Sequence, residues 1–83
     1  MLNAIAAVAD KVGGVDRINS IHRVVVYVAS HPTFTDQAKV ANGASDLLVE
    51  VFGAGRGSHV RSAVGVAVLP LDAPVEVELM VEL

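Results

Sequence analysis

The sequence predicts a small α/β (α+β) domain, in which two helices pack on one face of a sheet in the order helix, strand, helix, strand, strand. Two stretches repeat apolar residues at helical spacing, and three others are rich in β-branched residues. A length of 83 residues leaves room for one domain, spanning residues 1–83. The central strand–helix–strand succession favours a right-handed parallel crossover.

The first half of the chain contains one helix and one strand. Apolar residues at helical spacing predict a helix over Leu2–Val12, which Gly13 and Gly14 would end. The helix starts with no strand ahead of it. A strand is expected over Ile21–Ala29. Its almost continuous apolar run, Val24–Val28, is typical of a strand covered on both faces.

A second helix is expected over Asp36–Phe52. Gly43 lies inside it, which close packing against a neighbour would explain, and Gly53 would end it before a glycine-rich loop, Ala54–Ser58. The apolar residues of its expected buried face are Val40, Ala44, Leu47, Leu48 and Val51.

The last two strands are expected over Arg61–Leu69 and Val75–Leu83, and both alternate with period two. We expect their Val-rich faces to lie under the helices. The opposite faces combine small residues with charges, which suits a ligand pocket or another subunit. The link between them carries two prolines, so a simple hairpin is not expected. The four residues predicted to be buried are Val64, Val66, Val77 and Leu79.

Composition excludes several function classes. There is no Cys, so disulfides and thiolate metal sites are absent, and the three His have no zinc-ligand spacing. A net charge of −3 and few aromatic residues make nucleic acid an unlikely partner. No apolar run is long enough for a membrane span, and a cytoplasmic location is expected. Hydrophobic residues form 53% of the chain, which favours self-association, although an ordinary core would also account for them.

Arg61 is the candidate binding residue, because it begins an otherwise apolar strand and its planar fork suits a carboxylate. The alternative is a salt bridge to a glutamate of the last strand. Glu76 and its neighbours would by default face solvent, or one of them could position water. No Gly-x-Ser-x-Gly elbow is present, so a Ser-His-Asp hydrolase is not expected.

Several motifs carry a resemblance to a known family. The stretch Val60–Ala67, with its Arg-Ser pair, is followed by Leu69-Pro70 and by the alternating glutamates of Val75–Glu78. Upstream lie the Asn-Gly-Ala-Ser-Asp helix of Val40–Leu47 and the sequence Val51–Gly53. Together they resemble the C-terminal two-thirds of a domain of the Rid family, which is also called the YjgF or L-PSP endoribonuclease-like family.

The resemblance implies a Bacillus chorismate mutase-like mixed sheet, a homotrimer with clefts between subunits, and no metal or organic cofactor. It implies hydrolysis of enamines or imines to 2-keto acids, with Arg61 holding the substrate carboxylate and Glu76 positioning water. The other residues that it places in the substrate site are Ser45, His59, Ser62 and Ala63. His59 and Ala63 depart from the common Pro and Cys of the family. The opening strands of the family precede the matched region, so an N-terminally truncated domain is expected.

Three hypotheses remain open from the sequence. The first is a small-molecule (2-imino or 2-keto acid) binding protein with imine deaminase activity. The second is a non-catalytic ligand-binding or structural member of the same fold. The third is endoribonuclease activity, which the net acidity disfavours.

Overall fold

A computed structural model describes residues 2–83, although the side chains of residues 2–4, 8, 12 and 15 lie outside the description. The elements follow the predicted order, with two short 3-10 turns between them. In chain order they are α1 (Leu2–Val12), η1 (Val15–Arg17), β1 (Ser20–Ala29), α2 (Gln37–Gly57), β2 (Val60–Val66), η2 (Pro70–Asp72) and β3 (Val75–Glu82).

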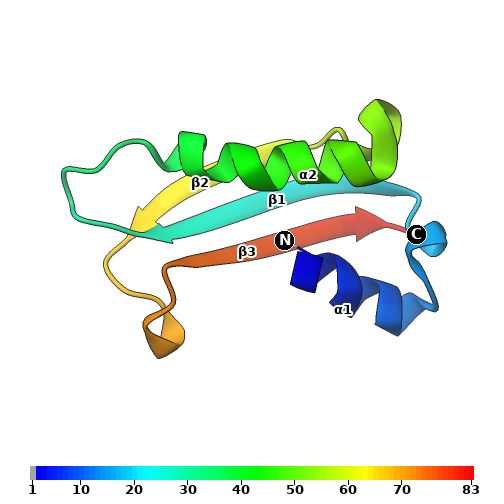
Figure 1. Cartoon of the computed structure of the whole chain (residues 1–83), viewed down its shortest axis with the longest axis horizontal. Helices are drawn as coiled ribbons and strands as arrows, with labels where there is room; N and C mark the ends of the chain where they lie inside the picture. Colours follow the sequence, from blue (N-terminus) through cyan, green and yellow to red (C-terminus); the bar gives the residue numbers. More distant parts are fainter. Residues whose placement is uncertain (1) are drawn as a thin grey trace.

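The three strands form one mixed sheet in the order β2-β1-β3. β1 pairs with β2 in parallel and with β3 antiparallel, so the predicted parallel strand–helix–strand unit is confirmed. Figure 1 shows α2 running along β1 and β2, while α1 lies beside the end of β3. The link Ala67–Pro74 carries the chain past the end of β1, and the amide of Ala29 donates to the carbonyl of Pro74 at 2.9 Å. β2 and β3 therefore do not form a hairpin, as the two prolines predicted.

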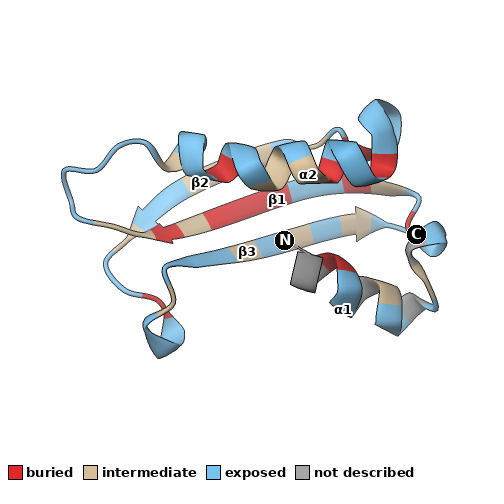
Figure 2. Ribbon diagram, viewed as in Figure 1, coloured by how far each residue is buried: buried red, intermediate tan, exposed pale blue. Residues whose placement is uncertain are grey.

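The hydrophobic core lies between the sheet and both helices. Val24, Val26 and Val28 of β1 are buried and pack with Ile5 of α1 and Leu48 of α2. Figure 2 shows that burial is concentrated in β1, the central strand, while β2 and β3 are mostly exposed or intermediate. Val25, on the other face of β1, is also buried. The prediction that both faces of this strand carry buried residues is thus partly met, because its neighbours Arg23 and Tyr27 are not buried.

The predicted face of β2 is wrong. In the parallel register Ala63 lies beside Val26, and Val64 lies beside Tyr27. Because paired residues in a sheet point to the same side, Arg61, Ala63 and Gly65 face α2, whereas Val64 and Val66 face away from it. Val64 is consequently 41% exposed. The face of β2 under α2 therefore carries the small residues Ala63 and Gly65, and a Cβ on Gly65 would meet the side-chain ends of Gln37 and Ser30.

The predicted face of β3 is correct. Leu79 lies beside Val24 and Val77 beside Val26, and both pack against the core. They are only partly buried, because β3 is an edge strand of this sheet. The central strand of the described sheet is β1 and not the last strand.

The sheet face turned away from the helices is called the open face below. It alternates with the core face along every strand, so its members follow from the register. The side chains of the open face are Arg23, Val25 and Tyr27 of β1, Val60, Ser62, Val64 and Val66 of β2, and Glu76, Glu78 and Met80 of β3.

The buried stripe of α2 differs from the predicted one. The structure buries Ala41, Leu48 and Phe52, while Val40 and Val51 are each 43% exposed. Both stripes satisfy the helical period, and they share Leu48. The helix turns Ala41 toward the sheet and leaves two valines outside.

Gly53 breaks α2, where φ is +83° and ψ is 165°, so the predicted helix end lies at a true kink. The expected loop after it is instead one more helical turn that reaches Gly57. Gly57 is buried against the preceding helix, and a Cβ there would lie 2.6 Å from the carbonyl oxygen of Leu48. The close packing expected at Gly43 is absent from this chain, since a Cβ at Gly43 would meet nothing within 4 Å.

These two glycines give opposite predictions. Gly57→Ala is expected to lower the free energy of unfolding by about 1–3 kcal/mol, because the methyl group meets fixed backbone atoms. Gly43→Ala is expected to raise it by up to about 1 kcal/mol, because alanine is the better helix residue and has room. Urea unfolding of both variants measures this. Shifts of the same sign would contradict the packing assigned to Gly57.

Candidate functional site

Four polar side chains meet where α2 passes over the start of β2. Asn42 and Ser45 come from α2, where they are three residues apart and so lie on one face. His59 and Arg61 come from the chain that enters β2 after the Gly53 kink. We call these four residues the Arg61 cluster. Arg61 points toward α2 because its register neighbour in β1 is Val24, a core residue.

The hydrogen bonds of the Arg61 cluster have assignable directions. Nδ1 of His59 lies 2.6 Å from the carbonyl of Gly57, which can only accept, so Nδ1 carries the proton. With the proton on Nδ1 alone, Nε2 is an acceptor, and the hydroxyl of Ser45 donates to it at 3.0 Å. Nη1 of Arg61 in turn donates to Oγ of Ser45 at 3.2 Å and to Oδ1 of Asn42 at 2.9 Å.

Only neutral acceptors hold the guanidinium of Arg61. Within the described part of the chain, Nε and Nη2 have no protein acceptor, and no carboxylate pairs with the group. The alternative of a salt bridge to the last strand is not met, because Glu76 and Glu78 lie on the open face and β1 separates β3 from β2. The cluster borders a surface hollow that Val49 and Ser58 also line. Arg61 thus keeps part of its fork for an anion.

The structure brings together three of the six predicted site residues, namely Ser45, His59 and Arg61. Ala63 follows on the same face of β2, where it packs against the core. Ser62 points to the open face. Glu76 also points to the open face, on the far side of β1, so one chain does not place it beside Arg61.

Asn42 is the member of the cluster that sequence reasoning missed. In the sequence it belongs to the Asn-Gly-Ala-Ser-Asp helix, and no motif assigns it a role. Its position three residues before Ser45 in a helix was the available signal. In the structure Asn42 orients Arg61, because its Oδ1 accepts the shorter of the two hydrogen bonds that Nη1 of Arg61 donates.

A second polar group gathers at one end of the open face. Oε1 of Glu82 accepts from Nδ2 of Asn19 at 2.9 Å, and its Oε2 lies 2.8 Å from Nε2 of His22. These hydrogen bonds, from Asn19 first and then His22, lower the pKa of Glu82. Further along the face, the hydroxyl of Tyr27 donates to Glu78 at 3.2 Å, and this bond together with the charge of Glu78 raises the pKa of Tyr27.

The lowered pKa of Glu82 predicts a pH effect on stability. The carboxylate contributes stability above the unfolded pKa of a glutamate, about 4.3, and that contribution is lost as the pH falls through the lower folded pKa. Glu82→Gln should therefore flatten the loss of Tm between about pH 5 and pH 3. Thermal unfolding followed by circular dichroism measures it, with Glu50→Gln, on the exposed surface of α2, as the control. Equal pH profiles of the Glu82 variant and the unmodified chain would contradict this prediction.

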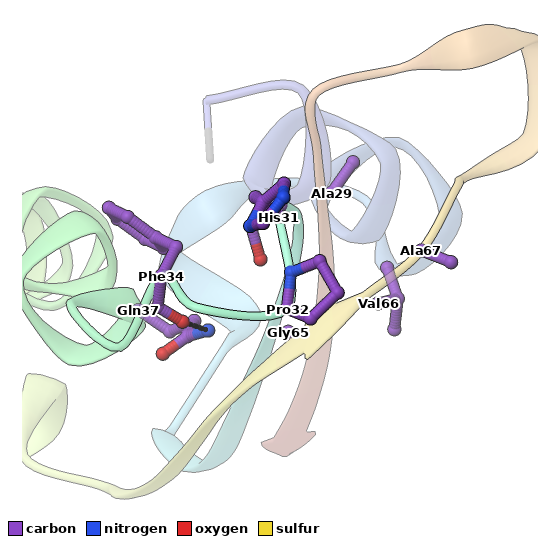
Figure 3. Close-up of a pocket in the computed structure, with 9 residues that line it drawn as sticks. Ala29, His31, Pro32, Phe34, Gln37, Gly65, Val66 and Ala67 are labelled. Atoms are coloured by element: carbon purple, nitrogen blue, oxygen red, sulfur yellow. Dashed lines mark hydrogen bonds between the residues drawn. The ribbon is translucent and has the colours of Figure 1, made fainter.

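A separate hollow lies at the other end of α2, next to the carboxyl ends of β1 and β2. Figure 3 shows Phe34 and Gln37 on one side of it and Val66 and Ala67 on the other, with His31 near the turn between them. Nε2 of Gln37 donates to the carbonyl of Phe34 at 2.8 Å, which fixes that side. No residue of the Arg61 cluster lines this hollow, so the two hollows are separate.

Neither a metal cluster nor a membrane helix is found in the described part of the chain. Among residues 2–83, no group of three or more His, Asp or Glu side chains could hold a metal ion. No described helix is both long enough and apolar enough to cross a bilayer.

Comparison with known proteins decides the family. The family model described as "YjgF/chorismate_mutase-like, putative endoribonuclease" matches residues 1–83. This chain belongs to that YjgF family. The resemblance read from the Arg-Ser and Glu-x-Glu motifs is therefore confirmed, and so is the chorismate mutase-like fold with its mixed sheet and two helices.

Three known proteins are similar to this chain over most of its length. Protein TCP17 of Trypanosoma cruzi is 48% identical over 82 residues, which is 99% of this chain and 51% of that protein. The crystal structure of Atu1372 from Agrobacterium tumefaciens, a protein of unknown function, is 39% identical with a TM-score of 0.88, over 94% of this chain and 50% of that one. A "putative endoribonuclease" from Shewanella oneidensis is 36% identical with a TM-score of 0.91, over 99% of this chain and 54% of that one. This chain spans about half the length of these relatives.

Proposed function

We propose that this chain binds a small carboxylate of the 2-keto or 2-imino acid type at Arg61. The observation that carries the proposal is that the guanidinium of Arg61 is only partly hydrogen-bonded within the described chain. Asn42 and Ser45 orient it through Nη1 alone, and no described carboxylate neutralises it. A guanidinium held in this way is ready to accept a carboxylate through two parallel hydrogen bonds.

The chemistry of a 2-imino acid fits the same arrangement. Its carboxylate would occupy the free side of Arg61, and its C=N carbon would lie next to the hollow that Ser45 and His59 border. Hydrolysis adds water to that carbon and releases ammonia, so it needs a group to take a proton from water. Glu76 was the expected group, but in the same chain it lies across β1 on the open face. Deaminase activity with Glu76 therefore requires the glutamate of a second copy.

Self-association through the open face is the second part of the proposal, and a homotrimer is the form that the resemblance implies. The open face leaves Val60 67%, Val64 41% and Met80 52% exposed, beside a row of glutamates on β3. Apolar surface of this kind is unusual on a face that meets only water. Sedimentation at about 20–50 μM should show an oligomer, a range suited to weak specific assembly. Val64→Glu, which places a charge on this face, should shift it toward monomer. A well-folded monomer would contradict the assembly.

Two assays separate the function classes. Isothermal titration with pyruvate should give a measurable binding heat, and release of keto acid from an imine generated in solution reports deaminase activity. We expect binding and little or no turnover, since Glu76 lies on the open face and Arg61 lies on the face that α2 covers. Binding without turnover would identify a ligand-binding member of the fold.

Endoribonuclease activity is the remaining class, because one similar structure is described in those words. Incubation of the chain with RNA at several salt concentrations tests it. The net charge of −3 argues for no salt-dependent binding or cleavage.

A further inference from the structure

We propose that Ser45 and His59 form a nucleophile–base pair, so that the Arg61 cluster can cleave short esters that carry a carboxylate. The choice of a carboxylate-bearing substrate rests on the binding proposed above at Arg61, whereas the Ser–His pair rests on its own geometry. The sequence contains no serine hydrolase motif that would indicate this pair. The kink at Gly53 brings its two members together from positions 14 residues apart.

The order of hydrogen bonds is the one that nucleophilic catalysis requires. The hydroxyl of Ser45 donates to Nε2 of His59 at 3.0 Å, so the base is in place to take the serine proton. Nδ1 of His59 donates to the carbonyl of Gly57 at 2.6 Å, which fixes the tautomer and the ring. The Gly57 carbonyl stands where an aspartate stands in a catalytic triad. Because this carbonyl is neutral, it stabilises an imidazolium less than an aspartate would, and modest rates are expected.

Arg61 adds the second component of the site. Its Nη1 donates to Oγ of Ser45 at 3.2 Å, which favours negative charge on that oxygen. The free side of the same guanidinium is then only a few atoms from the nucleophile. Ser45, His59 and Arg61 all border one surface hollow, so a substrate can reach them together. A molecule whose carboxylate sits on Arg61 and whose ester carbonyl lies a few bonds away can present that carbonyl to Ser45.

The reaction balances with water as the only other reactant. Oγ of Ser45 attacks the ester carbonyl while its proton moves to Nε2 of His59. The bond from the carbonyl carbon to the alcohol oxygen then breaks, and the proton on Nε2 passes to the leaving alcohol. Water next attacks the acylated Ser45 and gives its proton to Nε2. Release of the acid returns the proton to Oγ, so the net change is ester plus water to acid plus alcohol.

The chain offers a matched control serine. Ser58 borders the same hollow, but its hydroxyl donates to the carbonyl of Ala54 and not to a histidine. Ser58→Ala should therefore leave the chemistry intact, while Ser45→Ala should remove it. His31 is the matched histidine, because it lines the hollow of Figure 3, which no residue of the Arg61 cluster borders.

The test uses 3-acetoxybenzoate, an acetyl ester with a carboxylate, and neutral phenyl acetate, with product release followed by absorbance. The unmodified chain should cleave 3-acetoxybenzoate in preference to phenyl acetate. Ser45→Ala and His59→Gln should lower that rate by roughly 10²–10⁴-fold. Arg61→Ala should lower the cleavage rate of 3-acetoxybenzoate by roughly ten- to a hundredfold, so that the preference over phenyl acetate disappears. Ser58→Ala and His31→Gln should leave both rates unchanged. Diisopropyl fluorophosphate should label Ser45 in the unmodified chain, and labelling should disappear in His59→Gln.

The outcomes separate this inference from the proposed binding function. Unchanged cleavage in Ser45→Ala, or a label on another residue, overturns the Ser–His pair even if pyruvate still binds at Arg61. Cleavage and labelling that depend on Ser45 and His59 support the pair even if pyruvate gives no binding heat, and in that case the carboxylate site at Arg61 is the part that fails. Circular dichroism of each variant confirms that the fold is retained.

Discussion

Leu48→Ala is expected to lower the free energy of unfolding by about 2–5 kcal/mol. Leu48 has no exposed surface, and it lies in the cluster that joins α2 to Val24 and Val26 of the central strand. Truncation removes most of its side chain and leaves a cavity that the rigid sheet cannot fill. Native domains are stable by only about 5–15 kcal/mol, so the variant should be close to unfolding at 37 °C.

Val51→Ala on the same helix is the matched control. The apolar pattern groups Val51 with Leu48, but the structure leaves it 43% exposed. Its truncation should change stability by no more than about 0.5 kcal/mol, because little apolar surface returns to water. Urea unfolding of the two variants compares the two stripes directly. Equal losses would show that the helix packs on the stripe predicted from the sequence and not on the one in the structure.

Element order was predictable because periodicity is a local property. Helical spacing located α1 and α2, a continuous β-branched run located β1, and period-two alternation located β2 and β3. The two prolines indicated that β2 and β3 do not form a hairpin. Gly53 was correctly identified as the end of the regular helix. The last helical turn, up to Gly57, depends on contact with the backbone of Leu48, which no local pattern reveals.

The face of β2 was not predictable from hydrophobicity. Alternation separates Val64 and Val66 from Ala63 and Gly65, but it does not say which set lies under a helix. The hydrophobic pattern assigns the more apolar set to the core, whereas the register with β1 places the smaller set under α2.

The face of β2 also bears on the site. The resemblance implies that Arg61 holds the substrate carboxylate and that Glu76 positions water. The register places them on opposite sides, with β1 between their strands. Ser45 and His59, taken from the family resemblance, do lie beside Arg61. Their union depends on the Gly53 kink, which returns the chain to the start of β2.

Arg61→Ala is expected to weaken pyruvate binding by roughly 10–150-fold, which corresponds to about 1.5–3 kcal/mol. The guanidinium is the only described cationic side chain in the cluster, and the loss removes both its charge and its fork. Isothermal titration measures the change. Because Asn42 and Ser45 are neutral partners, removal of Arg61 leaves no buried charge without a counterion, and the fold should be retained.

Two further arginine variants make this test specific. Arg61→Lys keeps the charge but not the planar fork, so it should restore only part of the affinity if the ligand is held through two parallel hydrogen bonds. Arg23→Ala removes an arginine from the open face, on the other side of the sheet, and should leave the affinity unchanged. Equal losses in the Arg61 and Arg23 variants would indicate a general charge effect. Full affinity in Arg61→Ala would place the carboxylate elsewhere, and an unfolded Arg61→Ala would show that its bonds to Asn42 and Ser45 hold α2 on the sheet.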